Sequence, residues 1–190
     1  MAILHPLATV EYPSSDGLPM AESDFQRKPL TYAVEALGIY FQHRAEVYVS
    51  GNMFIYYEEG NLEAVVAPDV FVVLGTTKRD RASYMLWEEP KGPDFVLEIT
   101  SRSTRTKDQG PKRGTYAFLG VREYFQYDPT HDYLVPALQG HGWSLGVTRP
   151  CSLPPCPTAR SCCTVRYLDS MCVWKRARCA STILSRGRSC

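Results

Sequence analysis

The chain has no long apolar segment: no run approaches the roughly 18 apolar residues that a membrane-spanning helix requires. Its amino terminus, MAILHPLATVEYPSSDG, also lacks the basic region and following apolar stretch of a secretory signal peptide. We therefore expect a soluble cytoplasmic protein. With 190 residues, of which 44% are hydrophobic and 12% aromatic, the chain is long enough to form one domain with a buried core.

Cysteine is absent from residues 1–140, and acidic residues are almost absent from residues 141–190. The first segment contains 13 Lys and Arg against 19 Asp and Glu, a formal charge of −6. The second contains 8 against 1, a formal charge of +7, so the two sum to the net +1 of the chain. This break in composition predicts a domain over residues 1–140 and an atypical tail over residues 141–190.

The seven cysteines of the tail lack the spacing of a structural zinc site. Such sites usually bring thiolates as closely spaced pairs, with a second matching pair. Here the gaps between successive cysteines are four, five, zero, eight, six and ten residues, and the one histidine of the tail, His141, is isolated. We therefore expect no zinc in the tail. The odd count and the missing signal peptide also argue against a secreted disulfide framework.

Three interpretations of residues 141–190 remain. Arg outnumbers Lys seven to one there, which is typical of a basic arm that binds nucleic acid, although such arms are not usually rich in cysteine. The second interpretation is that the tail is the protein's true C-terminus, translated in frame, with an unusual composition. The third is translation out of frame, because a GC-rich gene that is translated in the wrong frame yields a sequence rich in Arg, Ser, Cys and Pro. We favour the third, expect an irregular tail and assign no function to it.

The first 140 residues carry the pattern of an α/β domain. In MAESDFQRKPLTYAVEALGIYFQHR, apolar residues recur three or four positions apart, which predicts a helix with one buried face. Three β-rich runs follow (AEVYVS, MFIYYE and EAVVAPDVFVVLG), and then a polar loop, TTKRDRASYMLWEEPKG. The strand PDFVLEIT, a short helix that ends at Gly120 and a strand around residues 123–127 complete the order. Alternating helices and strands around apolar central strands predict an α/β fold.

The strand PDFVLEIT contains a carboxylate, Glu98, among apolar residues. Removing an ionised carboxylate from water is costly, so a buried one is normally paired, protonated or bound to a cation. Side chains alternate across a strand, which places Phe95, Leu97 and Ile99 on the face opposite Glu98. If the strand that follows Asp69 pairs with this one, Asp69 and Glu98 come from positions roughly 5 Å apart.

Two carboxylates at that separation would repel each other, and one would be driven toward its neutral form. A divalent cation removes this conflict, and magnesium usually binds through one or two carboxylates, with water and substrate phosphate completing its shell. We therefore predict that Asp69 and Glu98 are metal ligands. The alternative is that Glu98 lies at a sheet edge or pairs with an arginine.

The first 140 residues of the sequence resemble a known family. Pro68-Asp69 on one strand and Glu98-Ile99-Thr100 on the next resemble the PD-(D/E)XK nuclease superfamily, which has the restriction-endonuclease-like fold. Six segments in order are similar to the Uma-two family of restriction endonucleases, abundant in cyanobacteria: YPSSDGLPMAES, YVSGNMFIYYEEGN, APDVFVVLG, SYMLWEE, PDFVLEITSRST and KRGTYAFLGVREYFQYDP. The resemblance implies a mixed central β-sheet flanked by helices, and Mg²⁺ or Mn²⁺ held by Asp69 and Glu98 for the hydrolysis of DNA. The expected partners are DNA and a second copy of the chain.

The sequence departs from the superfamily at Thr100, where the motif has a lysine two residues after the acid. The Uma-two family tends instead to have a lysine on the following helix, and Lys112 matches that position. Asp108, Lys112 and Tyr116 are spaced by four, so they would share one face of a continuous helix. Pro111 would disrupt such a helix unless the helix begins near it, with Asp108 outside. We predict that Lys112 is catalytic and that its ammonium lies within about 6 Å of the Glu98 carboxylate, a separation that one water bridges. The alternative is a solvated surface lysine.

The second departure is the tail, because the chain no longer resembles the family from about His141 onward. Two functions therefore stay open: a magnesium-dependent endonuclease, or a non-catalytic DNA-binding or interaction protein that keeps the nuclease fold. The charge of −6 on residues 1–140 is unfavourable for neutralising phosphates. Metal ions and a strip of basic residues could offset it, although such a strip is equally typical of solvated loops. The strip consists of Lys78, Arg79, Arg81, Arg102, Arg105, Lys107, Lys112 and Arg113.

Overall fold

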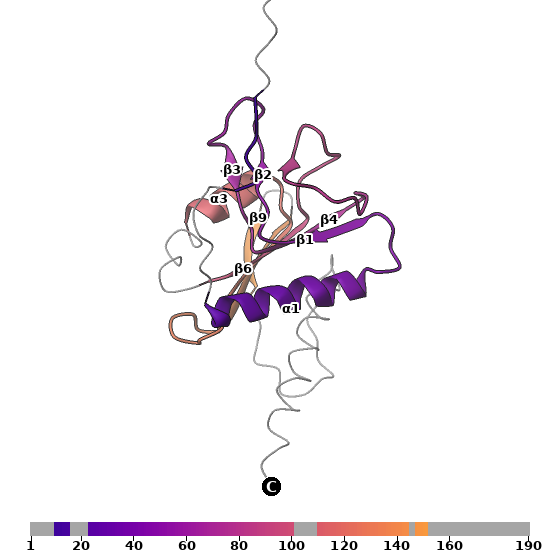
Figure 1. Ribbon diagram of the computed structural model, residues 1–190. Helices are drawn as coiled ribbons and strands as arrows, with labels where there is room; N and C mark the ends of the chain where they lie inside the picture. The colour runs from indigo at the N-terminus through magenta and orange to yellow at the C-terminus, as the bar shows by residue number, and fades with distance from the viewer. Residues whose placement is uncertain (1–9, 16–22, 101–109, 145–146, 152–190) are drawn as a thin grey trace, which may run out of the picture.

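The computed structural model describes residues 10–15, 23–100, 110–144 and 147–151 (Figure 1). Two helices and nine strands are formed there: α1 (Asp24–Tyr40), β1 (Val47–Ser50), β2 (Ile55–Tyr56), β3 (Val65–Val66), β4 (Val70–Leu74), β5 (Tyr84–Met85), β6 (Phe95–Ile99), α3 (Pro111–Phe118), β7 (Glu123–Tyr127), β8 (Leu138–Ser144) and β9 (Val147–Cys151). No helix in this part of the chain is both long and apolar enough to cross a membrane.

The central sheet has six strands in the order β1-β4-β6-β7-β8-β9. Strands β6 and β7 are parallel, and the other neighbours are antiparallel. A parallel pair needs a connection that crosses from one end of the sheet to the other. Helix α3 lies in that connection, after β6 and before β7. The predicted α/β fold with a mixed central sheet is confirmed.

Helix α1 packs along one face of the central sheet (Figure 1). Ala33 and Leu37 are its fully buried residues, and Phe41 follows directly after its end. They form one core cluster with apolar side chains of the strands, among them Phe95, Leu97 and Ile99. These three residues share a face of β6, as the alternation in PDFVLEIT predicts. The apolar face that the helix pattern predicts and the apolar face that the strand pattern predicts are therefore buried in the same core cluster.

The opposite face of the central sheet packs against α3 and a second, three-stranded sheet, in the order β3-β2-β5. Tyr116 of α3 and Tyr84 of β5 have no exposed surface there, and both lie in a core cluster with Val96 of β6. Helix α3 begins with Pro111, and the first turn of a helix is where the missing backbone N–H of a proline is best tolerated. Asp108 lies outside the described residues.

The structure differs from the sequence-based prediction in two places. The run EAVVAPDVFVVLG forms two strands, β3 and β4, which belong to different sheets. The predicted polar loop contains β5, which pairs in parallel with β2 through Ile55 and Tyr84. A strand of two residues has no alternation to detect, because only its partner in the folded protein defines it.

Strands β8 and β9 continue the central sheet to Cys151, beyond the break in composition near residue 140. Residues 152–190 lie outside the described residues. The prediction of an irregular tail without a zinc site therefore stays a prediction for that segment.

Candidate active site

Glu98 lies in the middle of the central sheet with 1% of its surface exposed. Both of its carboxylate oxygens accept hydrogen bonds from α3. The ammonium of Lys112 donates to Oε2 at 2.9 Å, and the hydroxyl of Tyr116 donates to Oε1 at 2.6 Å. A paired cation and a buried donor offset the cost of removing this carboxylate from water. Within the described part of the chain, the cation that pairs with Glu98 is a lysine.

Lys112 and Tyr116 reach Glu98 together because they are four residues apart on α3, so they lie on the same side of the helix. The Lys112 side chain is 28% exposed, so it reaches from the surface to the buried carboxylate. The distance to Glu98 is within the predicted separation, whereas the catalytic role of Lys112 stays a prediction.

Tyr116 is a site residue that the sequence reasoning did not select. Its ring is fully buried, and its hydroxyl contacts the carboxylate directly. Burial, and after it the negative charge of Glu98, raises the pKa of Tyr116 well above its ordinary value. The phenol is therefore a permanent donor to Glu98. Its signal in the sequence was the spacing of four from Lys112.

Asp69 lies directly before β4, at the same level of the sheet as Glu98. The register pairs Val70 with Leu97, and one further step along the antiparallel ladder brings Asp69 opposite Glu98. The Oδ2 atom of Asp69 accepts a hydrogen bond of 2.6 Å from the backbone N–H of Ile99. This bond fixes the Asp69 carboxylate to the backbone of the strand that carries Glu98.

The backbone of Asp69 is also held from the side of β1. Gly51 follows β1, and a Cβ atom there would collide with the carbonyl oxygen of Asp69. The next residue, Asn52, donates its backbone N–H to the carbonyl of Pro68 at 3.0 Å. The absence of a side chain at position 51 therefore permits the close approach that positions the Pro68-Asp69 segment.

Thr100, which stands where the superfamily motif has lysine, is bonded outside the cluster of Asp69, Glu98 and Lys112. Its hydroxyl lies 2.5 Å from the hydroxyl of Tyr133, and its backbone N–H donates to the carbonyl of Tyr127 at 2.8 Å. Thr100 is 2% exposed. The cation next to Glu98 therefore comes from α3 and not from β6.

Tyr133 is held in place by Asp128, which organises the segment after β7. The Asp128 carboxylate accepts hydrogen bonds from the backbone N–H groups of Thr130, His131, Tyr133 and Leu134 and from the Thr130 hydroxyl. Burial alone would raise the pKa of Asp128, but the N–H donors of Tyr133 and Leu134 outweigh it and, with Thr130, bring the pKa to about 2.

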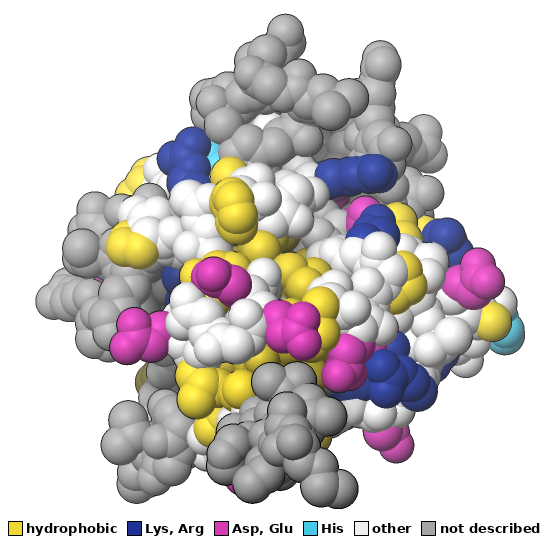
Figure 2. Space-filling model, turned by 90° about the horizontal axis from the view of Figure 1, so that it is seen from above, with side chains coloured by type: hydrophobic (Ala, Val, Ile, Leu, Met, Phe, Trp, Pro, Cys, Tyr) yellow, Lys and Arg dark blue, Asp and Glu magenta, His cyan; other side chains and the backbone are white. Residues whose placement is uncertain are grey.

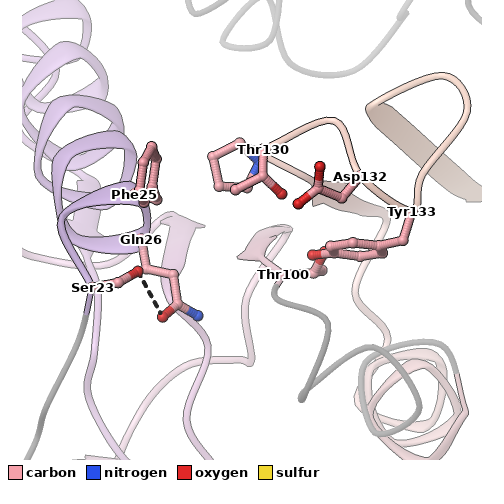
Figure 3. Close-up of a pocket in the computed structure, with 8 residues that line it drawn as sticks. Ser23, Phe25, Gln26, Thr100, Thr130, Asp132 and Tyr133 are labelled. Atoms are coloured by element: carbon pink, nitrogen blue, oxygen red, sulfur yellow. Dashed lines mark hydrogen bonds between the residues drawn. The ribbon is translucent and has the colours of Figure 1, made fainter.

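A pocket of about 180 Å³ lies between this segment and the start of α1 (Figure 3). Its lining comes from the start of α1, the end of β6 and the segment after β7, and consists of Ser23, Phe25, Gln26, Thr100, Pro129, Thr130, Asp132 and Tyr133. In Figure 3 the α1 residues lie on one side of the pocket, with Asp132 and Tyr133 across from them. Asp69, Glu98 and Lys112 do not line it.

The donor set of Asp69 and Glu98 fits a hard divalent cation. Magnesium takes one or two protein carboxylates and completes its shell with water and phosphate oxygen. Each carboxylate oxygen has more than one lone pair, so an oxygen that accepts from Lys112 or Tyr116 retains capacity to bind a cation. Among the described residues, no group of three or more His, Cys, Asp or Glu side chains is placed to hold a metal ion. The arrangement suits magnesium or manganese and lacks the ligand set of a closed structural site.

The described members of the predicted basic strip do not all face solvent. Lys78 donates to the carbonyls of Phe41 and Gln42. Arg81 is 2% exposed, pairs with Glu89 through two of its nitrogens and lies 4.3 Å from the ring centre of Tyr48. These two residues stabilise the fold. The strip members at positions 102, 105 and 107 lie outside the described residues.

Charges of both signs are mixed on the side of the protein opposite α1. Figure 2 shows apolar side chains near the centre of this face, acidic side chains next to them and basic side chains closer to the rim. The described side chains on this face therefore form no continuous basic surface.

Comparison with known proteins gives a family and a structural relative. The model of the family Uma2, described as "Putative restriction endonuclease", matches residues 6–144. A crystal structure from Anabaena variabilis, described as a "putative nuclease belonging to DUF820", is 14% identical to this chain. The alignment has a TM-score of 0.48 and covers 73% of this chain and 75% of the other. No curated protein matches the chain.

Proposed function

This chain belongs to the Uma2 family, which is described as putative restriction endonucleases, and on that premise we propose that it is a metal-dependent endonuclease that hydrolyses phosphodiester bonds of DNA. Asp69, Glu98 and Lys112 are its catalytic residues, and Asp69 and Glu98 hold Mg²⁺ or Mn²⁺. Tyr116 positions Glu98.

The observation that carries the proposal is the burial of Glu98, at 1% exposure, beside Lys112 and level with Asp69. A buried ion pair with no functional role can often be replaced, as a pair, by apolar residues of similar volume without loss of stability. A carboxylate that holds a cation cannot be replaced in this way, and a nearby lysine can contact the phosphate that the cation binds.

Each residue of the cluster has a distinct role in the proposed reaction. When bound, the metal ion polarises the phosphoryl group and activates water for attack. Asp69 and Glu98 supply its carboxylate ligands, and Tyr116 keeps Glu98 fixed through its hydroxyl. The Lys112 ammonium stabilises the negative charge that develops on the phosphate, because a preorganised cation favours the transition state over the ground state.

A non-catalytic DNA-binding or interaction protein is the second candidate. Thr100 favours it, because the motif lysine is missing and the hydroxyl in its place is bonded to Tyr133. In this case the Lys112–Glu98 pair would serve only to stabilise the fold, as buried pairs in many proteins do. The two candidates differ in cleavage, because the second binds DNA or another partner without cutting DNA.

Supercoiled plasmid separates the two candidates. The purified full chain is incubated with plasmid and Mg²⁺ or Mn²⁺, and conversion to nicked circles is followed on a gel with and without a chelator. We expect nicking that needs the divalent ion and is lost in Asp69→Asn and in Glu98→Gln. Retained DNA binding without nicking would support the non-catalytic candidate.

The domain division stays a proposal. We propose that residues 1–140 carry the nuclease site and that the tail from residue 141 arises from a change of reading frame. The nucleotide sequence of the gene tests the second statement: an alternative frame downstream of codon 140 should encode a terminus low in cysteine and containing acidic residues. If the existing frame alone is open there, the frameshift is excluded.

A further inference from the structure

Polar side chains occupy one level of the central sheet on four neighbouring strands. Glu98 of β6 is paired with Gln126 of β7, and Gln126 is paired with Gln139 of β8. Asp69, directly before β4, lies opposite Glu98 one step beyond the Val70–Leu97 pair. Residues paired across a ladder project from the same face. The row of carboxylates at the site therefore continues into a row of amides.

The face that Gln126 shares is the one covered by α3. Tyr124 precedes Gln126 by two residues on β7, so their side chains project to the same side. The Tyr124 ring lies 5.3 Å from the ring of Tyr116, centre to centre, in the core cluster beneath α3. Gln126 therefore lies next to Glu98, one strand spacing of about 4.8 Å away along the ladder.

Gln126 is buried, with 2% of its surface exposed, and its Nε2 atom has no hydrogen-bond acceptor among the residues that the structure describes. The neighbouring glutamine differs, because Nε2 of Gln139 donates to the carbonyl of Val135 at 3.3 Å. A buried amide N–H without an acceptor destabilises a protein, and an apolar residue of similar volume would avoid this cost. The amide of Gln126 is thus a donor that the described part of the fold leaves unused, next to the Glu98 carboxylate.

We propose that Gln126 contacts the substrate, and that its Nε2 donates a hydrogen bond to a non-bridging oxygen of the phosphodiester bound over Glu98. This inference rests on the proposed function and adds a residue to it. Phosphate oxygens only accept hydrogen bonds, which suits a donor. A neutral amide also orients the phosphate without the charge that would make a lysine or arginine at this position pair with Glu98.

The test uses the full chain, a short DNA duplex labelled with a fluorophore, and Ca²⁺ in place of Mg²⁺ so that binding is measured without cleavage. Gln126→Leu removes the donor at nearly the same volume. Gln139→Leu is the matched control, since it removes an amide at the same level of the sheet that is already bonded within the chain. We expect Gln126→Leu to weaken duplex binding by about 10-fold to 100-fold, the usual effect of losing a hydrogen bond to a charged group. Gln139→Leu should change it less than about twofold.

Urea unfolding without DNA or divalent ion gives the second measurement. Because the amide of Gln126 is left without an acceptor in the described fold, Gln126→Leu should unfold at the same or a higher urea concentration than the wild type. Equal duplex binding by Gln126→Leu and wild type would overturn the inference, and so would a lower unfolding midpoint, which would reveal a structural partner. Absence of duplex binding by the wild type would also overturn it. If the wild type binds the duplex but never nicks plasmid, the proposed endonuclease activity is refuted. The proposed contact between Gln126 and phosphate would still stand.

Discussion

Tyr116 donates a hydrogen bond of 2.6 Å from a fully buried phenol to Oε1 of Glu98, which is itself 1% exposed. The bond joins α3 to the centre of the main sheet, and no solvent competes for it. The two residues are 18 positions apart and belong to different kinds of secondary structure. The geometry of the candidate site depends on this contact, because Glu98 can hold a cation at a fixed position only if its second oxygen is also fixed.

Removing the Tyr116 hydroxyl should destabilise the protein. In Tyr116→Phe, Glu98 keeps its burial and loses one donor, so the free energy of unfolding should fall by about 1 to 3 kcal/mol. Urea denaturation measures it. Tyr40→Phe is the control, because Tyr40 is 39% exposed and its hydroxyl should contribute less than about 0.5 kcal/mol. Equal losses in the two variants would mean that the hydrogen bond to Glu98 contributes no more to stability than an exposed hydroxyl does.

Divalent ions should stabilise the protein through Asp69 and Glu98. A ligand that binds only the folded state raises the melting temperature by mass action, so millimolar Mg²⁺ or Mn²⁺ should raise Tm of the wild type. Asp69→Asn and Glu98→Gln should each lose this shift, whereas Glu35→Gln, at an exposed position of α1, should keep it. A shift of the same size in all four proteins would show that the ions bind elsewhere.

Lys112 should contribute to cleavage beyond its contribution to folding. Lys112→Ala should reduce plasmid nicking by about 100-fold to 1,000-fold, the usual effect of removing one preorganised group that stabilises developing charge. The variant should also lose roughly 2 kcal/mol of stability, since Glu98 loses a charged hydrogen-bond partner.

The double variant Lys112→Ala/Glu98→Gln isolates the contribution of Lys112 to stability. It removes the charge that Lys112 compensates, so it should be more stable than Lys112→Ala. Lys28→Ala is the control for charge alone, because the Lys28 side chain is 73% exposed, and it should nick at the wild-type rate. Nicking at the wild-type rate by folded Lys112→Ala would show that Lys112 serves only the fold.

Asp128 should make stability depend on pH in the acidic range. Its pKa is about 2 in the folded protein against an ordinary value of 3.8. A lowered folded pKa stabilises the protein above the unfolded pKa, and the stabilisation is lost as pH falls through the folded value. The pKa difference corresponds to about 2 kcal/mol.

Asp128→Asn tests this pH dependence. The variant should be less stable than the wild type by roughly that 2 kcal/mol at pH 6, and the difference should shrink between about pH 4 and pH 2. Urea unfolding of both proteins at pH 6, 4, 3 and 2 measures it. A difference that stays constant over this range would assign the effect of the substitution to geometry and not to ionisation.

Patterns with a short period were readable from the sequence. The alternation in PDFVLEIT correctly placed Phe95, Leu97 and Ile99 on the face opposite Glu98. The apolar spacing before position 41 correctly predicted α1. The spacing of four between Lys112 and Tyr116 put both on one side of a helix, and Pro111 marked its start. Each of these features depends on local backbone geometry, which repeats every 2 or 3.6 residues.

Contacts between distant segments were decided only by the folded chain. Local periodicity contains no rule that pairs Gln126 with Glu98 across β6 and β7 or forms β5 from two residues of a polar segment. The approach of Lys112 to Glu98 was predicted from the family resemblance and not from periodicity. Arg81 shows the same limit, because its sequence neighbours suggested a phosphate-binding strip, whereas the structure buries it against Glu89. The sequence by itself determined α1, α3 and the strand that carries Glu98, because local periodicity and chemical type specify them. The tertiary structure determined which donor meets which acceptor, because burial and strand register depend on the packing of segments far apart along the chain.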